Sequence, residues 1–263
     1  MLLENKTAVV YGGGGSIGGA VARAFAREGA RVFLAGRTSS TLEAVADEIR
    51  TAGGEVEAAQ VDALDEKAVD DHANEIAQRT GAIDVSFNAI GDPDTHGTPV
   101  LQMMYEEYEA PIVNALRAQF LIARAAARHM AARGSGVILA VTATTARQAV
   151  PEVGATWVRF DSTESLCRQL ASELGPSGIR VVTLRTTGIP TVPPDTSYTF
   201  PDYGTGSGGM TFEELLVWLK EKPMLKRLTT LSEVANVAAF VASDRASAVT
   251  GSVVNVNCGS VLE

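Results

Sequence analysis

The chain has 263 residues, of which 46% are hydrophobic, and it carries a formal net charge of −9 with a pI of about 5.0. An acidic chain without clustered Lys and Arg is a poor match for nucleic acid or for an anionic membrane surface. No apolar stretch reaches the roughly 20 residues that span a bilayer, and the first residues lack the pattern of a secretory signal peptide. We therefore expect a soluble, cytoplasmic protein whose length suits one large core. Its two cysteines, Cys167 and Cys258, are expected to be reduced core residues.

Apolar runs typical of buried strands alternate along the chain with apolar patterns of helical spacing. Ser40 and Glu43 form a capping-box pattern, and Pro111 fits only at a break in its helix or in a fresh first turn. The alternation predicts a single doubly wound α/β domain over 1–263, because right-handed crossovers join parallel neighbours and place helices on both faces of the sheet. The expected strands cover 7–10, 31–35, 56–61, 83–88, 137–142, 179–184 and 253–256. The expected helices begin near 17 and 40, cover about 65–79, 102–132, 157–174 and 232–242, and include a short one after 211.

The first strand leads directly into a glycine-rich turn, with the sequence VVYGGGGSIGGA over 9–20. The glycines at 13, 15 and 18 fit the G-x-G-x-x-G fingerprint. Gly12 and Gly18 also fit a T-G-x-x-x-G-x-G variant, from which Tyr11 and Ser16 depart. Glycine suits such a turn because the backbone adopts positive φ and approaches a pyrophosphate, whose charge rests on the first amides of the next helix. The order of strand, turn and helix therefore predicts a dinucleotide site.

An irregular stretch follows the sixth strand, over 186–210, and contains four prolines and the run GTGSGG. Long loops in α/β domains are commonly lids, and this one leaves the carboxyl end of a strand, where ligands bind. We interpret 186–222 as a lid, with a passive insertion as the alternative.

Further markers lie along the rest of the chain. They are Asp62 after the third strand, Asn88-Ala89 after the fourth, Asn114 in the long helix, the string KRLTTLSEVANVAAFVASDRASAVTG and the ending VTGSVVNVNCG. With these markers the whole chain resembles the short-chain dehydrogenase/reductase family, most of all its bacterial ketoacyl-reductase-like members. The resemblance implies a seven-stranded Rossmann sheet, oxidoreductase activity on a small-molecule substrate, and a homo-oligomer, commonly a tetramer, built through the two long helices. The cofactor-binding residues expected here are Gly12, Gly15, Ser16, Ile17, Gly18, Arg37, Thr38, Asp62, Asn88, Ala89 and Ile189.

The end of the second strand is expected to meet the adenosine ribose of the cofactor. An acidic residue there would bind the 2′-hydroxyl of NAD and repel a 2′-phosphate. The residues here are GRTS over 36–39, and the guanidinium of Arg37 beside hydroxyls suits bidentate phosphate binding. We therefore expect NADP as the cofactor, the alternative being that Arg37 is only a solvated loop cation. Asp62 is expected to accept a hydrogen bond from the adenine amino group, and Asn88 to pack against the adenosine side.

The catalytic positions are where the chain departs from the family that it resembles. In relatives a Tyr transfers the proton, a Lys four residues later lowers the Tyr pKa, and a Ser 13 residues before the Tyr polarises the carbonyl. Alignment from both sides places Thr156, Phe160 and Ala143 at these positions, and of the family set only Asn114 remains. No lysine occurs between positions 67 and 220, so no slip restores the pair. A threonine hydroxyl does not ionise usefully at neutral pH without an adjacent base.

Other residues are candidates for the missing chemistry. Arg159 lies next to the Lys position and could hold a ribose or an oxyanion, although its guanidinium is no base. His96, on the loop after the fourth strand, can titrate near neutrality, with a solvated polar loop as the alternative. Thr142 and Thr144 flank the Ser position, so one of their hydroxyls could reach a substrate oxygen. Asp92 and Asp94 share the loop of His96, where the Asp-x-Asp-x-His spacing is too generic to predict a metal site, and Tyr198 and Tyr203 lie on the predicted lid.

Two functions fit these residues. The first is an NADP-dependent oxidoreductase that acts on a carbonyl or a related small molecule by hydride transfer, with a non-standard proton relay. The second is a catalytically inactive cofactor-binding sensor or supporting subunit. Fold analogy favours the first and the altered site favours the second. For the first, the candidate catalytic residues are Asn114, Thr142, Thr144, Thr156, Arg159 and His96.

Overall fold

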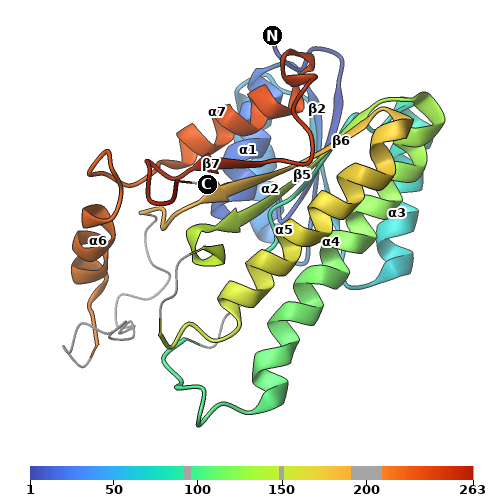
Figure 1. Ribbon diagram of the computed structural model, residues 1–263. Helices are drawn as coiled ribbons and strands as arrows, with labels where there is room; N and C mark the ends of the chain where they lie inside the picture. The colour runs from blue at the N-terminus through green and yellow to red at the C-terminus, as the bar shows by residue number, and fades with distance from the viewer. Residues whose placement is uncertain (92–95, 148–150, 191–208, 263) are drawn as a thin grey trace.

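Seven parallel strands form one sheet at the centre of the protein (Figure 1). The structure is a computed structural model that describes residues 1–91, 96–147, 151–190 and 209–262. The predicted doubly wound α/β fold is confirmed. From one edge to the other, the strands are β3 (Val56–Gln60), β2 (Arg31–Gly36), β1 (Thr7–Tyr11), β4 (Val85–Asn88), β5 (Gly136–Ala143), β6 (Ile179–Thr186) and β7 (Val253–Val256).

Helices cover both faces of the sheet (Figure 1). One face carries α1 (Ser16–Arg27), α2 (Ser39–Thr51) and α7 (Leu231–Ala242), and the other carries α3 (Glu66–Thr80), α4 (Tyr105–Arg133) and α5 (Thr156–Leu174). The short α6 (Phe212–Glu221) stands apart from both layers. None of the helices in the described part of the chain has the length and apolar character needed to cross a bilayer. Short 3-10 turns cover Thr144–Ala146, Gly175–Ser177 and Asp244–Ala246.

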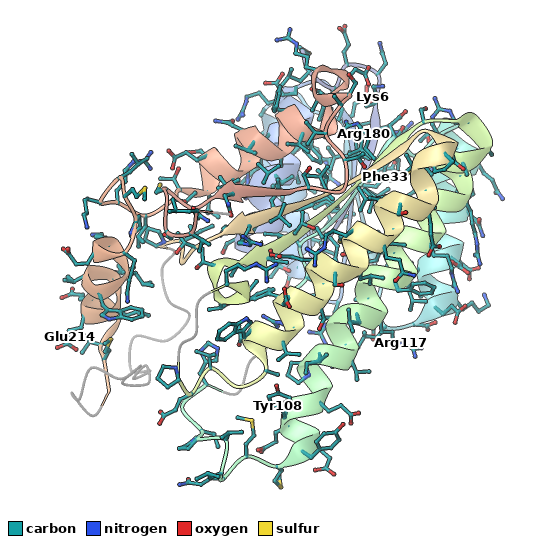
Figure 2. The ribbon with its side chains drawn as sticks, in the orientation of Figure 1. Lys6, Phe33, Tyr108, Arg117, Arg180 and Glu214 are labelled. Carbon is teal, nitrogen blue, oxygen red and sulfur yellow. The ribbon has the colours of Figure 1, made fainter. Side chains whose placement is uncertain are left out.

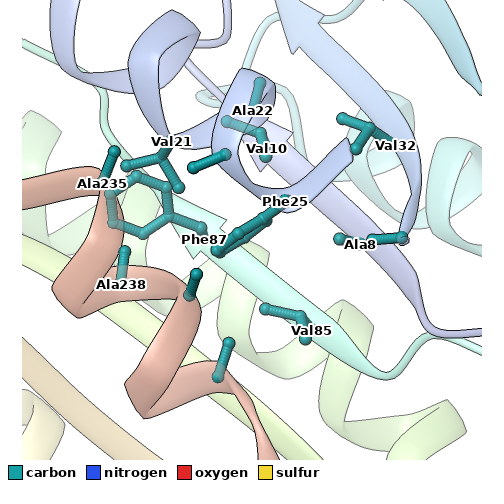
Figure 3. Close-up of a cluster of buried hydrophobic side chains, with 14 of the residues drawn as sticks. Ala8, Val10, Val21, Ala22, Phe25, Val32, Val85, Phe87, Ala235 and Ala238 are labelled. Atoms are coloured by element: carbon teal, nitrogen blue, oxygen red, sulfur yellow. The ribbon is translucent and has the colours of Figure 1, made fainter. Parts of the chain in front are cut away.

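Two hydrophobic cores lie on the two faces of the sheet, because successive side chains of a strand point to opposite faces. In β1, Ala8 and Val10 belong to the core under α1 and α7, whereas Val9 and Tyr11 belong to the core under α3, α4 and α5. Figure 3 shows the first core, in which Phe25 of α1 and Phe87 of β4 lie with small side chains of α7. The alanines of α7 let that helix pack closely on α1.

The carboxyl ends of the strands define one end of the molecule. Lys6 and Arg180, near the amino ends of β1 and β6, lie at the opposite end from Glu214 of α6 (Figure 2). The strand order reverses between β1 and β4, and sheets of this kind bind ligands at the carboxyl ends beside such a switch point. The topology therefore places the glycine turn after β1 and the loop after β4 side by side.

The expected capping box at Ser40 and Glu43 is wrong. Helix α2 begins earlier, with Thr38 as its N-cap, and the Thr41 hydroxyl donates to the Thr38 carbonyl at 2.9 Å. Glu43 instead forms an ion pair with Arg50 at 3.0 Å. Ser40 lies inside the first turn, where its hydroxyl cannot act as the N-cap.

The expectation for Pro111 is also wrong, because α4 runs without a break from Tyr105 to Arg133 with this proline inside it. A proline lacks the N–H that would bond the carbonyl four residues earlier. The first turn is supported separately, since the carboxylate of Glu107 accepts from the Met104 N–H at 3.3 Å. Pro111 is buried, so the packing of its ring offsets the lost hydrogen bond.

Candidate functional site

A cavity of about 340 Å³ lies along the carboxyl ends of β1, β2 and β4 and continues to α4 and α5. Arg37 lines one end, and Arg159 and Phe160 line the other. Four residues predicted to bind the cofactor, Ser16, Ile17, Gly18 and Ile189, are not among its lining residues. The predicted site residues that do line it are Gly12, Gly15, Arg37, Thr38, Asp62, Asn88, Ala89, Asn114 and Arg159.

The glycine turn is packed too tightly for side chains at two positions. Gly12 has a φ of +75°, and a Cβ atom there would lie 2.7 Å from the carbonyl oxygen of Ala89. At Gly18 a Cβ atom would collide with the carbonyl oxygen of Gly12. Helix α1 therefore begins directly against the turn, with Gly15 as its N-cap. Its first amides form the partly positive helix end that favours an anion.

The end of β2 presents an exposed cation. The backbone carbonyl of Arg37 accepts from the Gln60 side chain at 2.9 Å, which fixes the loop, while the Arg37 side chain is exposed. Among the described residues, the Arg37 guanidinium makes no ion pair. Across the cavity, the carboxylate of Asp62 accepts from the Leu64 N–H at 3.0 Å.

The end of β4 is fixed by an amide pair that sequence reasoning missed. The side chain of Asn88 donates to Gln119 of α4 at 2.9 Å and accepts from the Ile90 N–H at 3.0 Å. Gln119 lines the cavity, is fully buried, and its Nε2 has no hydrogen-bond acceptor in the described part of the chain. A glutamine in an otherwise apolar helical stretch is the signal that could have identified it.

The first turns of α5 contain the residues at the altered catalytic positions. Thr156 is the first residue of α5 and is only 5% exposed. One turn later, the Arg159 guanidinium lies 4.4 Å from the centre of the Phe160 ring, an arrangement typical of a cation–π contact. Arg159 is buried although it is charged. This end of the cavity is therefore formed by an arginine stacked on an aromatic ring.

The structure brings together two of the candidate residues that lie far apart in the sequence. His96, on the loop after β4, has its Nε2 atom 3.0 Å from the Oγ1 atom of Thr156. Neither residue is among those that line the cavity, and Thr142 and Thr144 are not either. Asp92, Asp94, Tyr198 and Tyr203 lie outside the described residues, as do residues 191–208 of the predicted lid.

A buried charge cluster lies beneath the end of β5 and was not predicted. Glu164 of α5 and Arg185 of β6 form a two-bond ion pair, at 2.8 and 2.7 Å, with exposures of 0% and 2% for the two side chains. The Thr142 hydroxyl donates to the same carboxylate at 2.9 Å. Arg147 lies 3.6 Å from it and also pairs with Asp161 at 2.5 Å. A Glu and an Arg inside apolar sequence patterns were the available signal, since such charges are buried only when paired.

Comparisons with known proteins agree with this geometry. Residues 13–260 match the family described as enoyl-(acyl carrier protein) reductase. An uncharacterised oxidoreductase of Bacillus subtilis (strain 168) is 32% identical over 257 residues, covering 98% of this chain and 91% of the relative. The structure of a short-chain type dehydrogenase/reductase from Mycobacterium ulcerans is 25% identical with a TM-score of 0.86, covering 99% of this chain and 91% of that one. A 7α-hydroxysteroid dehydrogenase solved with NADH and 7-oxoglycochenodeoxycholic acid is also 25% identical, with a TM-score of 0.85 and coverages of 99% and 96%.

Proposed function

The chain belongs to the short-chain dehydrogenase/reductase family of oxidoreductases, and on that premise we propose that it uses NADP(H) to oxidise or reduce a small carbonyl-type substrate. The observation that carries the proposal is the cavity itself. It connects the exposed Arg37 at the end of β2 with Asn114 on α4 and with the Arg159–Phe160 pair on α5. A dinucleotide bound at the switch point would have its adenosine at the first end and its nicotinamide at the second.

The residues of the cavity fit such a cofactor. Gly12, Gly14 and Gly15 line the cavity beside the start of α1, where the first amides of the helix suit a pyrophosphate. In the part of the chain that the structure describes, the Nε2 donor of buried Gln119 has no acceptor, and a buried donor without a partner costs free energy. When bound, the nicotinamide supplies or accepts the hydride, and the protein provides orientation and electrostatics.

The preference for NADP rests on Arg37 and Thr38. Both line the cavity at the end of β2, and no carboxylate lies in the GRTS segment over 36–39 to repel a 2′-phosphate. An exposed guanidinium retains its five donors for a bidentate contact with a phosphate. The related hydroxysteroid dehydrogenase was solved with NADH. Family membership therefore does not by itself select NADP, and the preference proposed here rests on this segment.

The proton of the reaction has to come from a group other than a tyrosine activated by a lysine. Thr156 begins α5 and Phe160 lies one turn later, at the positions where the family resemblance places that pair. General acid–base catalysis typically contributes about 10²–10⁴-fold to a rate. We therefore propose that another relay operates here. An inactive cofactor-binding sensor is the outcome if no substrate is turned over.

An assembly is part of the same proposal. The outer faces of α4 and α5 expose large apolar side chains, among them Val113, Phe120 and Val158. We propose that these two helices pair with their copies in a homo-oligomer, and that 186–222 closes over the substrate as a lid.

The proposed function is tested by the steady-state reduction of a panel of ketones and ketoacyl thioesters with NADPH and with NADH. We expect turnover, with kcat/KM at least tenfold higher for NADPH because a charged contact with the 2′-phosphate is lost with NADH. Arg37→Ala should remove most of that preference. Arg245→Ala, an exposed arginine outside the cavity, is the matched control and should leave the ratio unchanged. Equal kcat/KM values for the two cofactors would refute the NADP assignment. Absence of turnover on the whole panel would refute the proposed oxidoreductase function.

A further inference from the structure

Thr156 and His96 come from separate parts of the chain and meet at the start of α5. The loop after β4 carries His96 to within 3.0 Å of the Thr156 hydroxyl, measured from Nε2 to Oγ1. The Thr156 N–H donates to the Val153 carbonyl at 3.2 Å, and the neighbouring Gly97 N–H donates to the Glu152 carbonyl at 2.8 Å. The first bond fixes the turn that begins α5, and the second joins the loop of His96 to that turn, so the backbone supports the hydroxyl–imidazole contact.

The position of the hydroxyl suits proton transfer. Thr156 is the first residue of a 19-residue helix, where the partly positive helix end stabilises negative charge that develops on an oxygen. An alkyl hydroxyl is a poor acid or base alone, but an adjacent imidazole activates it, as in other hydroxyl–histidine couples. An imidazole can donate or accept at Nε2 near neutral pH. The same turn of α5 continues into Arg159 and Phe160, which line the cavity.

We propose that Thr156 and His96 form the proton relay of this enzyme, an assignment that rests on the proposed function. In carbonyl reduction, the carbonyl carbon gains the hydride that the reduced nicotinamide gives up. The carbonyl oxygen takes the proton of the Thr156 hydroxyl, so that this O–H bond breaks and the O–H bond of the alcohol forms. Thr156 Oγ1 then recovers a proton from Nε2 of the His96 imidazolium. The neutral imidazole that remains takes up a proton from the solvent. Alcohol oxidation runs through the same atoms in reverse, with His96 accepting the proton.

Four variants separate this relay from a structural contact. Thr156→Val removes the hydroxyl at nearly constant shape, and Thr156→Ser keeps it. His96→Ala removes the imidazole from a loop, where folding is least affected. His129→Ala is the matched control, because His129 is partly exposed on α4, lies outside the cavity, and its described contact is with Asn74 at 3.1 Å.

We expect Thr156→Val and His96→Ala to lower kcat by about 10²–10⁴-fold, while the dissociation constant for NADPH changes less than threefold. Thr156→Ser should retain kcat within about tenfold, and His129→Ala should equal the wild type. Added imidazole should restore part of the kcat of His96→Ala, which a merely structural role would not allow.

A second measurement needs no cofactor. The protein has three histidines, so its imidazole resonances can be assigned by one substitution each. In ¹H–¹⁵N spectra of the unliganded protein, Thr156→Val should shift the Nε2 resonance of His96 and leave those of His72 and His129 in place. Thr156→Ser should keep the wild-type shift.

Each contrary result points to a different failure. If the wild type reduces carbonyls but Thr156→Val and His96→Ala keep kcat within threefold, the relay is overturned and the proposed function stands. If the Nε2 resonance of His96 does not shift in Thr156→Val, the relay is also overturned. If the wild type binds NADPH but reduces no carbonyl on the panel, the proposed function is overturned, and the relay is overturned with it.

Discussion

Tyr11, which departs from the glycine fingerprint, is explained by the core rather than by the cofactor. It ends β1, is buried, and meets His72 of α3 edge to face, with ring centres 6.0 Å apart at 81°. Burial raises the pKa of the Tyr11 phenol above its usual value, and the charge of Asp70 raises it further. The phenol therefore stays neutral, and this position serves the packing of α3 on the sheet.

His72 gives a prediction about pH and stability. Burial lowers the pKa of this imidazole, and its Nδ1 has no hydrogen-bond partner in the described part of the chain. Because the unfolded chain binds a proton near pH 6.5 and the folded chain binds it only at a lower pH, stability should fall as the pH drops below about 6.5. The loss is at most about 1.4 kcal/mol per pH unit, the limit for one proton. Urea unfolding of the wild type and His72→Gln at pH 7.5, 6.5 and 5.5 measures it.

The informative quantity is the difference in slope between the two proteins. His72→Gln should be less stable than the wild type at pH 7.5, but it should lose less stability toward pH 5.5. His129→Gln, at a position that is only partly buried, should follow the wild-type slope. Parallel curves for the wild type and His72→Gln would mean that the pKa of His72 is the same in the folded and the unfolded chain.

At the scale of elements, Glu164 and Arg185 join α5 to β6 beneath the site. Removing one member of a buried pair leaves a charge without its partner, which typically costs about 3–5 kcal/mol, whereas replacing both by apolar residues is often nearly neutral. We therefore expect Arg185→Met and Glu164→Leu each to destabilise by about 3–5 kcal/mol in urea unfolding. The double variant should be clearly more stable than the sum of the two losses predicts.

A matched control for this cycle is the exposed pair of Lys67 and Asp71 on α3. An exposed i,i+4 pair contributes about 0.3–0.5 kcal/mol, so Lys67→Met should have little effect. Additive losses in the Glu164–Arg185 cycle would show that Thr142 and Arg147 satisfy Glu164 without Arg185.

Local sequence patterns predicted most helices and strands correctly. They failed where a side chain's partner comes from a distant part of the chain. The short helix expected after 211 is confirmed as α6, and Thr211 caps it, since its hydroxyl accepts from the Glu214 N–H within the same turn. The pattern at Ser40 and Glu43 looks similar, yet the helix begins at Ser39. The Glu164–Arg185 pair could not be predicted, because spacing along one chain does not say which buried charges meet. The contact between His96 and Thr156 depends in the same way on a loop and a helix 60 positions apart.

At the scale of the whole molecule, sheet topology determines the site. The predicted strand–helix alternation and parallel sheet are confirmed, and the reversal of strand order between β1 and β4 brings the glycine turn and Asn88 to one cavity. The two ends of that cavity differ in chemistry. One has the exposed guanidinium of Arg37, while the other has Arg159 stacked on Phe160. We therefore expect the two halves of NADP to contribute unequally to binding.

The last prediction compares NADP with 2′-phospho-ADP-ribose, which lacks the nicotinamide. The family resemblance implies that relatives have a lysine at the position of Phe160, which holds the nicotinamide ribose. An apolar ring cannot donate hydrogen bonds to the ribose hydroxyls. An unsatisfied buried polar group costs about 1–3 kcal/mol, or roughly 5–150-fold in affinity. We therefore expect the two ligands to have dissociation constants within about tenfold in calorimetry. Phe160→Lys should tighten NADP and leave 2′-phospho-ADP-ribose unchanged, because only the former reaches α5. NADP binding more than 100-fold tighter to the wild type would instead mean that Arg159 or Asn114 already satisfies the ribose, and that Phe160 costs nothing at this end of the cavity.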